Sequence, residues 1–343
     1  MIDRIKIENL TVFENLEIDT SAPINVFIGE NGTGKTQILK FIYILCETLH
    51  PSKVFLSSRL SDLVRAHNLA LADFKVFYEG KERSLSLLHT DLKEYTNKHE
   101  DLKVANKEFK FTEDSWYARY PNKIEELKKS FVFIPAKDML THAKGFPEFS
   151  RKFELDFDRT YIDIIEESRL PKLREIPKIA KNILPELEKI MDGKVEINND
   201  RFYIKKRDGR LTSFDFEAEG VKKIGLLWQL LMNEAITEDT ILLWDEPDAN
   251  LNPNLASTIA HMLLELSRNG VKVFLSTHSY FLPKYFDLLE KDEKEVVFHS
   301  LYREKDDKVS PVICETSDTF SMLSRNSILG EVVELFEREM EWE

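Results

Sequence analysis

The sequence predicts an α/β fold in which buried strands alternate with helices. Short apolar runs, typical of buried strands, occur at 24–28, 131–134, 241–244 and 271–275. Segments with helical periodicity occur at 38–45, 221–236, 255–268 and 328–340. Residues 3–8 and 16–18 alternate apolar and polar side chains, so we expect an antiparallel β portion at the N-terminus. Together these patterns indicate a mixed sheet covered by helices.

The composition is that of a folded protein without a membrane span. The chain has 343 residues, 42% of them apolar, which is enough for one large α/β domain with an inserted lobe or for two domains. No apolar run reaches the roughly 20 residues that cross a bilayer, and the two cysteines form no disulfide framework, so we expect a cytoplasmic protein with no membrane contact. The net charge of −13 does not indicate nucleic-acid binding, but it leaves a local basic patch open.

Residues 29–36 lie between the apolar run 24–28 and the helical segment 38–45. They read Gly-Glu-Asn-Gly-Thr-Gly-Lys-Thr, the pattern G-x-x-x-x-G-K-[ST] between a strand and a helix. Glycines let backbone N–H groups approach a polyphosphate closely, and the start of the helix adds its positive dipole end. We predict that Lys35 reaches the β- and γ-phosphates and that the Thr36 hydroxyl ligates Mg²⁺. The predicted ATP-binding loop comprises Gly29, Glu30, Asn31, Gly32, Thr33, Gly34, Lys35, Thr36 and Gln37.

The apolar run 241–244 ends in two acidic residues, Asp245 and Glu246. A carboxylate at the carboxyl end of a core strand can hold Mg²⁺ or its waters, so Asp245 is the predicted metal ligand. Glu246 is placed to polarise a water molecule for attack on the γ-phosphate. The alternative is a strand that ends in acids at an ordinary surface turn.

Four segments together resemble the ABC/SMC-type ATPase superfamily: 29–36, 245–247, 249–253 and 276–279. Within it, the chain is similar to compact AAA-family ATPases without coiled coils, which are related to OLD-type and anti-phage defence ATPases. The resemblance implies a P-loop NTPase with an ABC-ATPase-like mixed sheet, an N-terminal antiparallel β portion and an inserted helical lid lobe. It says much less about residues 51–215.

The resemblance also implies roles for matching residues. Glu246 would be the general base, and His278, in Thr-His-Ser, would be the switch histidine that contacts the γ-phosphate. Lys35 would complete the catalytic set. Asn250 and Asn252 would occupy the loop that meets a second subunit, with Asn252 near the nucleotide.

Two stretches depart from the family pattern. The family's signature is a serine followed by glycines at a helix start, whereas here Ala218 replaces the serine and Glu219 the first glycine. Gly220 remains, so we expect Glu219 and Gly220 to act on the partner's nucleotide, with a plain helix cap as the alternative. The loop at 135–138 lacks the family's glutamine, and Lys137 there is either a phosphate or partner contact or a surface lysine.

We therefore expect an ATPase core at 1–50 and 217–343, a mixed insertion at 51–137 that returns to a core strand, and a helical lid lobe with a β-hairpin at 138–216. The predicted function is an ATP-hydrolysing switch that needs Mg²⁺, forms a homodimer through its ATP sites or a higher assembly of such dimers, and controls a separate effector protein. Prokaryotic anti-phage defence or toxin control is the context that the resemblance suggests. The alternatives are a DNA-repair or recombination ATPase that binds duplex DNA, and a weakly hydrolysing, nucleotide-gated scaffold.

Overall fold

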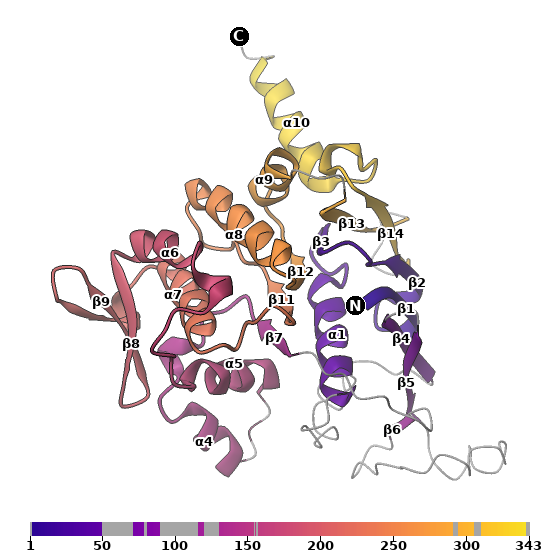
Figure 1. The fold of residues 1–343 in the computed structure, drawn as a ribbon. Helices are drawn as coiled ribbons and strands as arrows, with labels where there is room; N and C mark the ends of the chain where they lie inside the picture. Colours follow the sequence, from indigo (N-terminus) through magenta and orange to yellow (C-terminus); the bar gives the residue numbers. More distant parts are fainter. Residues whose placement is uncertain are drawn as a thin grey trace. The chain divides into compact units, whose positions relative to one another are not determined.

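The structure, a computed structural model, describes residues 2–49, 71–78, 81–89, 116–119, 130–153, 155, 157–290, 294–304 and 310–340 (Figure 1). The predicted charged stretch at 91–108 and the helical pattern at 124–129 lie outside these residues. The chain divides into two compact units, Met1–Lys128 with Val297–Glu343, and Lys129–Val296. This division does not test the domain boundaries expected above, which remain predictions.

The first unit contains an antiparallel sheet built from the N-terminal hairpin. Along this sheet the strand order is β2 (Phe13–Asp19), β1 (Ile2–Leu10), β4 (Leu71–Tyr78), β5 (Lys81–His89) and β6 (Trp116–Arg119). Ile5 and Ile7 on β1 are fully buried, while Lys6 between them is partly exposed, so the alternation in the sequence follows the two faces of the strand. The predicted N-terminal antiparallel β portion is confirmed.

The same unit holds the strand and helix around residues 29–36. The strand β3 (Ile24–Gly29) is buried at every position, and α1 (Lys35–Leu49) follows it directly. β3 neighbours β13 (Val296–Arg303), which pairs antiparallel with β14 (Val312–Ser317). The buried His299 on β13 bonds Asn25 on β3 through Nε2 at 3.1 Å, and its ring stacks on Phe27. A satisfied polar pair therefore fixes β3 beside β13.

The second unit contains three parallel strands, β7 (Phe131–Ile134), β11 (Ile241–Asp245) and β12 (Lys272–Ser276), with β11 in the middle. All three are buried at every position, which explains why they are mostly apolar, with Asp245, Lys272 and Ser276 as buried polar exceptions. Three further helices in this unit are α7 (Glu219–Met232), α8 (Ala256–Arg268) and α9 (Phe281–Leu289). The strands and the helices α7 and α8 agree with the sequence prediction, whereas α9 was not predicted.

The rest of the second unit is the segment predicted as a lid lobe. Its helices are α4 (Phe146–Lys152), α5 (Arg159–Arg169) and α6 (Leu184–Met191). Its small antiparallel sheet consists of β8 (Gly193–Asn198), β9 (Arg201–Lys206) and β10 (Leu211–Ser213), and the predicted hairpin is β8–β9. Figure 1 shows this hairpin beside α6 and α7, and α7 contacts α5, α6 and β8. The long apolar face of α7 is thus the core on which the helices and the hairpin pack.

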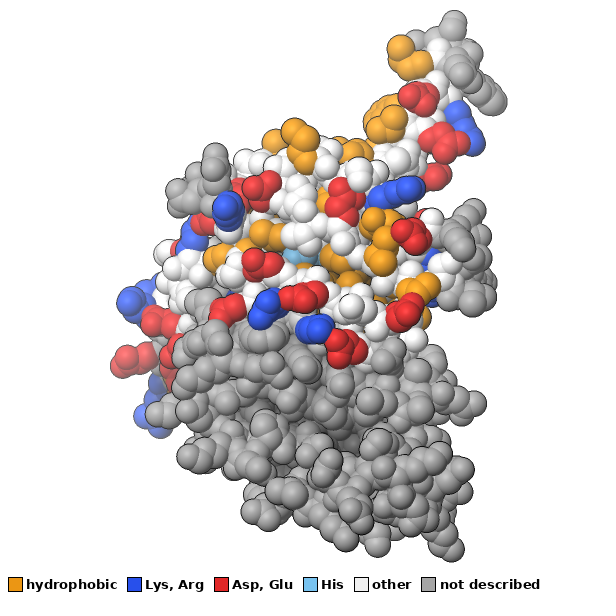
Figure 2. Space-filling model, turned by 90° about the vertical axis from the view of Figure 1, so that its right-hand side faces the viewer, with side chains coloured by type: hydrophobic (Ala, Val, Ile, Leu, Met, Phe, Trp, Pro, Cys, Tyr) orange, Lys and Arg blue, Asp and Glu red, His pale blue; other side chains and the backbone are white. Residues whose placement is uncertain are grey.

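The terminal helix α10 (Ser327–Met340) differs from the other helices of eight or more residues in the described part of the chain because none of its residues is buried. Its exposed apolar side chains include Val333, Leu335, Phe336 and Met340. Figure 2 shows hydrophobic side chains along this projecting helix, interspersed with acidic ones. Among the described residues, no helix is both long and apolar enough to cross a membrane.

A substitution pair tests how the N-terminal hairpin supports the loop at 29–36. Gly34 has φ +90°, and a Cβ there would lie 2.4 Å from Cζ of Phe13, whereas Gly32 has φ +79° with nothing near its Cβ position. We expect Gly34→Ala to destabilise the protein by roughly 3 kcal/mol, since the left-handed backbone and the ring clash add. Gly32→Ala should cost only about 1 kcal/mol from the backbone term. Urea unfolding of both variants measures the difference, and equal losses would contradict the packing of Phe13 against the loop.

Candidate nucleotide site

The loop at residues 29–36 has the backbone geometry that its glycines predict. Gly29, Gly32 and Gly34 all have positive φ values, of 140°, 79° and 90°. The Lys35 ammonium is almost fully buried and donates to the carbonyl oxygens of Gly29 at 2.8 Å and Glu30 at 2.7 Å. Thr33 Oγ1 also donates to the Glu30 carbonyl at 2.9 Å. The loop therefore curls around the lysine side chain, with α1 starting at Lys35.

Neighbouring elements of the first unit hold this loop in place. A Cβ on Gly29 would lie 2.2 Å from the Leu301 carbonyl oxygen on β13, so the close approach of the two backbones requires glycine. Thr11 Oγ1 donates to Gln37 Oε1 at 2.7 Å, and Arg303 donates to the Gly32 carbonyl at 3.3 Å. The Gln37 side chain is therefore engaged by the β1–β2 turn. Glu30 and Asn31 are exposed at the tip of the loop, and Thr36 is partly buried in the first turn of α1.

In the second unit, Asp245 and Glu246 form a tightly held turn at the end of β11. Asp245 is buried, and Ser276 Oγ donates to its Oδ1. Glu246 has φ +48°, a left-handed conformation that is strained for a glutamate. Its N–H lies 3.1 Å from the Ser276 carbonyl and 3.2 Å from Ser276 Oγ. Ser276, at the end of β12, therefore fixes both acidic residues.

A buried lysine completes this turn. Lys223 on α7 is 4% exposed, and its ammonium donates to the Glu246 carbonyl oxygen at 2.6 Å. Burial lowers the pKa of Lys223, while the carboxylates of Asp248, Glu246 and Asp245 raise it in turn. Burial raises the pKa of Asp248, whose two oxygens lie 2.9 and 2.8 Å from the donating hydroxyl of Thr277. Lys223 thus supplies both a hydrogen bond and a countercharge to the acidic turn.

The side chain of His278 lies next to Glu246. Its Nε2 is 3.6 Å from Glu246 Oε1, and both side chains are about one third exposed. The strand β12 ends at Ser276, so Ser276, Thr277 and His278 in succession face Asp245, Asp248 and Glu246. Two of the three predicted catalytic residues, Glu246 and His278, are thereby brought together within one unit.

The signature region shows what replaces the family's serine and glycine. Glu219 begins α7, and its Oε1 accepts from Lys222 Nζ at 2.7 Å. Lys222 Nζ also lies 3.9 Å from Asp138 Oδ2, so the Glu219 carboxylate shares a cationic partner rather than standing alone. Gly220 packs against the loop after β11, because a Cβ there would lie 2.5 Å from Leu251 Cδ2. Close packing is thus a sufficient reason for glycine at this position.

The predicted subunit-contact loop is exposed and locally ordered. Asn250 has φ +61°, which asparagine tolerates better than most residues. Asn252 caps the short helical turn Pro253–Leu255, since its Oδ1 accepts from the Asn254 N–H at 3.1 Å. Lys137, in the loop after β7, is exposed. These contacts are structural, and the roles of Glu219, Gly220 and Asn252 at a nucleotide remain predictions.

The donor chemistry fits a magnesium nucleotide. Thr36 offers a hydroxyl and Asp245 a carboxylate, both hard oxygen ligands of the kind that Mg²⁺ takes when phosphates and waters complete its shell. No group of three or more His, Cys, Asp or Glu side chains in the described part of the chain could hold a metal ion. A metal site built from protein side chains alone is thus not found there, whereas a metal ion that is bound together with phosphates needs fewer protein ligands.

Sequence reasoning missed Lys223 and Asp248. Lys223 stands among the apolar residues of α7, and a buried charge requires a partner, so its position was a usable signal. Asp248 lies three residues after Asp245 and was obscured by the stronger motif. Only the structure connects it to Thr277.

Comparison with known proteins supports the predicted fold class. The family described as "AAA domain, putative AbiEii toxin, Type IV TA system" matches residues 112–282. The DNA replication and repair protein RecF of Staphylococcus epidermidis is 27% identical over 190 residues, which are 54% of this chain and 45% of the relative. RecF of Cytophaga hutchinsonii is 35% identical over 98 residues, 25% of each chain. The chain thus spans about half or less of these relatives.

Solved structures show the same architecture. An SMC head bound to the C-winged helix domain of ScpA has a TM-score of 0.55 at 15% identity, covering 92% of this chain and 97% of that one. The Pyrococcus furiosus SMC head with an extended coiled coil, bound to the C-terminal domain of ScpA, has a TM-score of 0.54 at 14% identity, covering 99% of each. The loop at 29–36 and the turn at 245–246 carry the motifs of ABC/SMC-type P-loop ATPases, and these solved structures show that the chain has the fold of that class. The predicted α/β fold of that class is confirmed.

Two buried lysines, Lys223 on α7 and Lys272 on β12, provide a matched test of how the acidic turn is held. Lys223→Met should lower kcat for ATP by on the order of 10- to 100-fold with little change in KM, because the Glu246 backbone loses its donor and the carboxylate shifts. Lys272→Met, at a buried lysine on the end of β12 opposite Ser276, is the control and should leave kcat closer to that of the parent protein. Steady-state ATPase kinetics, with circular dichroism to verify folding, distinguish the two. Equal kcat losses in both variants would contradict a specific role for Lys223.

Proposed function

We propose that this protein is an ATP-hydrolysing molecular switch whose two subunits close on ATP and control a separate effector protein. The observation that carries the proposal is the Asp245–Glu246 turn. The backbone of Glu246 is strained and is held by Ser276 and Lys223, and its Oε1 lies 3.6 Å from His278 Nε2. Strained backbone conformations cost free energy, and they cluster at sites where a catalytic group is held in position for its reaction.

The proposed chemistry assigns a task to each residue. The loop at 29–36 and Lys35 would bind the β- and γ-phosphates, and Thr36 and Asp245 would hold Mg²⁺, which neutralises phosphate charge when bound. Glu246 would accept the proton of the attacking water, and His278 would stabilise the γ-phosphate as charge develops.

Dimerisation would complete the site. The exposed loop at 249–252 and the start of α7 fit a contact with a second subunit, as the resemblance to ABC/SMC-type ATPases implies. Because Glu219 is paired with Lys222, its charge is partly neutralised before any phosphate approaches, which reduces the repulsion that an unpaired carboxylate would cause. The helix start with Gly220 could then meet a partner's γ-phosphate through its backbone N–H groups and dipole.

An effector partner is supported by the surface of α10. Its exposed apolar side chains form a stripe on a helix with no buried residue, and exposed apolar stripes of this kind mark protein contacts. The matching family's description includes a toxin of a toxin–antitoxin system, and we extend that to this chain as a proposed role in anti-phage defence or toxin control.

A second candidate is a DNA-repair ATPase, favoured by the similarity to RecF over 190 residues. It predicts ATP-dependent binding of duplex DNA whose affinity falls steeply between 50 and 200 mM salt, by roughly 10³-fold if six phosphates are contacted. Fluorescence anisotropy with a labelled duplex, with and without ATP, measures this. A signal that does not change with ATP or salt would favour the effector switch.

The substitution Glu246→Gln separates the switch from a nucleotide-gated scaffold. If hydrolysis opens the dimer, the variant should lose ATP turnover by at least about 100-fold and accumulate as an ATP-bound dimer. Size-exclusion chromatography with light scattering, with and without Mg-ATP, measures the dimer. Lys35→Ala is the control, since it should bind no nucleotide and stay unaffected by ATP. An unchanged monomer–dimer balance in Glu246→Gln would favour the scaffold.

A further inference from the structure

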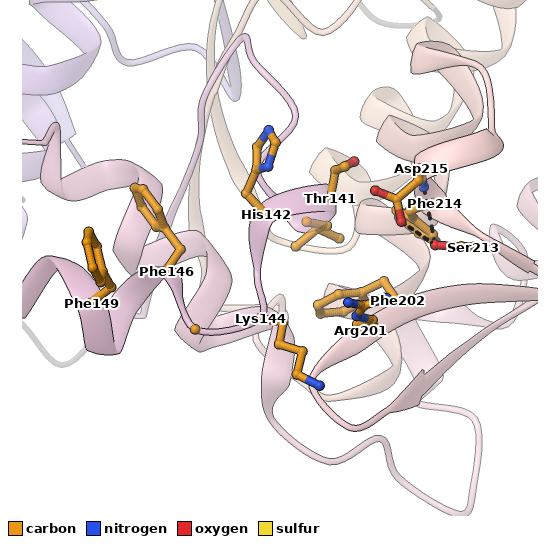
Figure 3. Close-up of a pocket in the computed structure, with 12 residues that line it drawn as sticks. Thr141, His142, Lys144, Phe146, Phe149, Arg201, Phe202, Ser213, Phe214 and Asp215 are labelled. Carbon is orange, nitrogen blue, oxygen red and sulfur yellow. Dashed lines mark hydrogen bonds between the residues drawn. The ribbon is translucent and has the colours of Figure 1, made fainter.

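The second unit carries a pocket of about 840 Å³ that the ATPase chemistry does not use. One wall comes from residues 140–149, which include the start of α4, and the other from the start of β9 and the turn after β10 (Figure 3). Its floor is apolar, because Leu140, Phe202 and Phe214 are buried beneath it. The volume lies in the range of pockets that take small organic ligands.

The rim of this pocket is cationic. His142, Lys144 and Arg201 line it and are exposed. Within the described part of the chain, neither Lys144 nor Arg201 has an ion-pair partner. The acidic residue of the lining, Asp215, accepts from the Ser213 hydroxyl at 2.6 Å and so already has a neutral donor. The pocket therefore presents the side chains of Lys144 and Arg201 and one carboxylate, that of Asp215, beside an apolar floor.

The aromatic rings of Phe146 and Phe149 line the wall of the pocket opposite Asp215. Figure 3 shows Phe146 and Phe149 on α4, away from the Ser213–Asp215 turn. Phe149 is 54% exposed although it belongs to a pocket, and its ring packs against Phe153 with centroids 4.6 Å apart. Phe146 packs similarly against Phe157 at 4.9 Å. Each lining ring is thus braced by a second ring and keeps surface available for stacking.

Charge balance also favours an anionic ligand here. Residues 138–216 contain 16 Lys and Arg and 16 Asp and Glu, so the whole net charge of −13 lies outside this segment. An anion approaching the protein is therefore repelled less over this lobe than elsewhere.

We infer that this pocket binds a nucleotide unit, with its planar base against the Phe146 and Phe149 side and its phosphate at Lys144 and Arg201. A single strand or a free nucleotide can present this chemistry, whereas a duplex keeps its bases stacked inside. The site is formed by other residues than the ATP loop and does not depend on hydrolysis.

The test uses the full-length chain with Lys35→Ala, so that loss of the ATP site and failure of this pocket are separate results. A fluorescein-labelled six-nucleotide dT strand is titrated at 50 mM salt without ATP or Mg²⁺, and dTMP and a duplex serve as competitors. We expect the strand to bind and the duplex to compete poorly. Equal competition by dTMP, counted per nucleotide, assigns the pocket to free nucleotides, and weaker competition assigns it to a strand.

Matched variants locate the binding. Phe149→Ala should weaken it by on the order of tenfold through lost stacking, whereas Phe216→Ala, at a ring 84% exposed outside the pocket lining, should not. Lys144→Gln should weaken strand binding and reduce the dependence of log affinity on log salt concentration by about 1, with Lys178→Gln, at an exposed lysine, as control.

The inference would be overturned by no strand or dTMP binding, by equal effects of the pocket and control variants, or by a duplex that binds as tightly as the strand. Binding of an acidic peptide in place of every nucleic acid would likewise overturn it, in favour of a protein partner.

Discussion

The contact on which the geometry of the acidic turn in the second unit depends is the hydrogen bond from the buried Lys223 ammonium to the Glu246 carbonyl oxygen. A carboxylate-rich turn with a left-handed glutamate is costly by itself, since Asp245, Glu246 and Asp248 repel one another and the backbone is strained. Burying a lysine is also costly. When the lysine lies beside the carboxylates, their attraction offsets both the cost of burying the lysine and the repulsion within the turn. The turn is therefore held in one conformation. Because Lys223 belongs to α7, the helix that carries the signature residues, the turn and that helix are mechanically one piece.

The loop at 29–36 in the first unit also holds a buried lysine, but it does so with backbone carbonyl groups. Three glycines at positive φ let the chain fold around the Lys35 side chain, whose ammonium is held by the carbonyls of Gly29 and Glu30. The neighbours Phe13 and Leu301 leave no room for side chains at Gly34 and Gly29. The packing of Phe13 and Leu301 against the loop and the hydrogen bonds of Lys35 within it therefore favour the same loop conformation. Because residue types, backbone angles and packing all favour this conformation, the motif predicts it well from sequence.

Much of the fold could be predicted because its core strands are buried on both faces. The runs ending at Ile134 and Trp244 are apolar throughout, and the run ending at Leu275 is apolar except for the buried Lys272. Each proved to be a parallel strand. The helix α9 was missed because Pro283 and the aromatic residues around it do not read as a helix start. For the signature region at the start of α7, the sequence predicts the departure from the family pattern but not the contacts of the residues there. The sequence indicates that Glu219 is anomalous, but its pairing with Lys222 depends on side-chain positions that spacing alone does not determine.

The sequence by itself determined the class of protein, the phosphate loop and the acidic residues after β11, because these depend on residue types at fixed local spacings. The tertiary structure decided which groups support them: Ser276 and Thr277 meet Asp245 and Asp248 across parallel strands, and Lys223 reaches the turn from a helix more than 20 residues away. It also decided that Phe149, Lys144 and Arg201 share one pocket. Such contacts join segments far apart in the chain, and only the packing of the strands and helices brings them together.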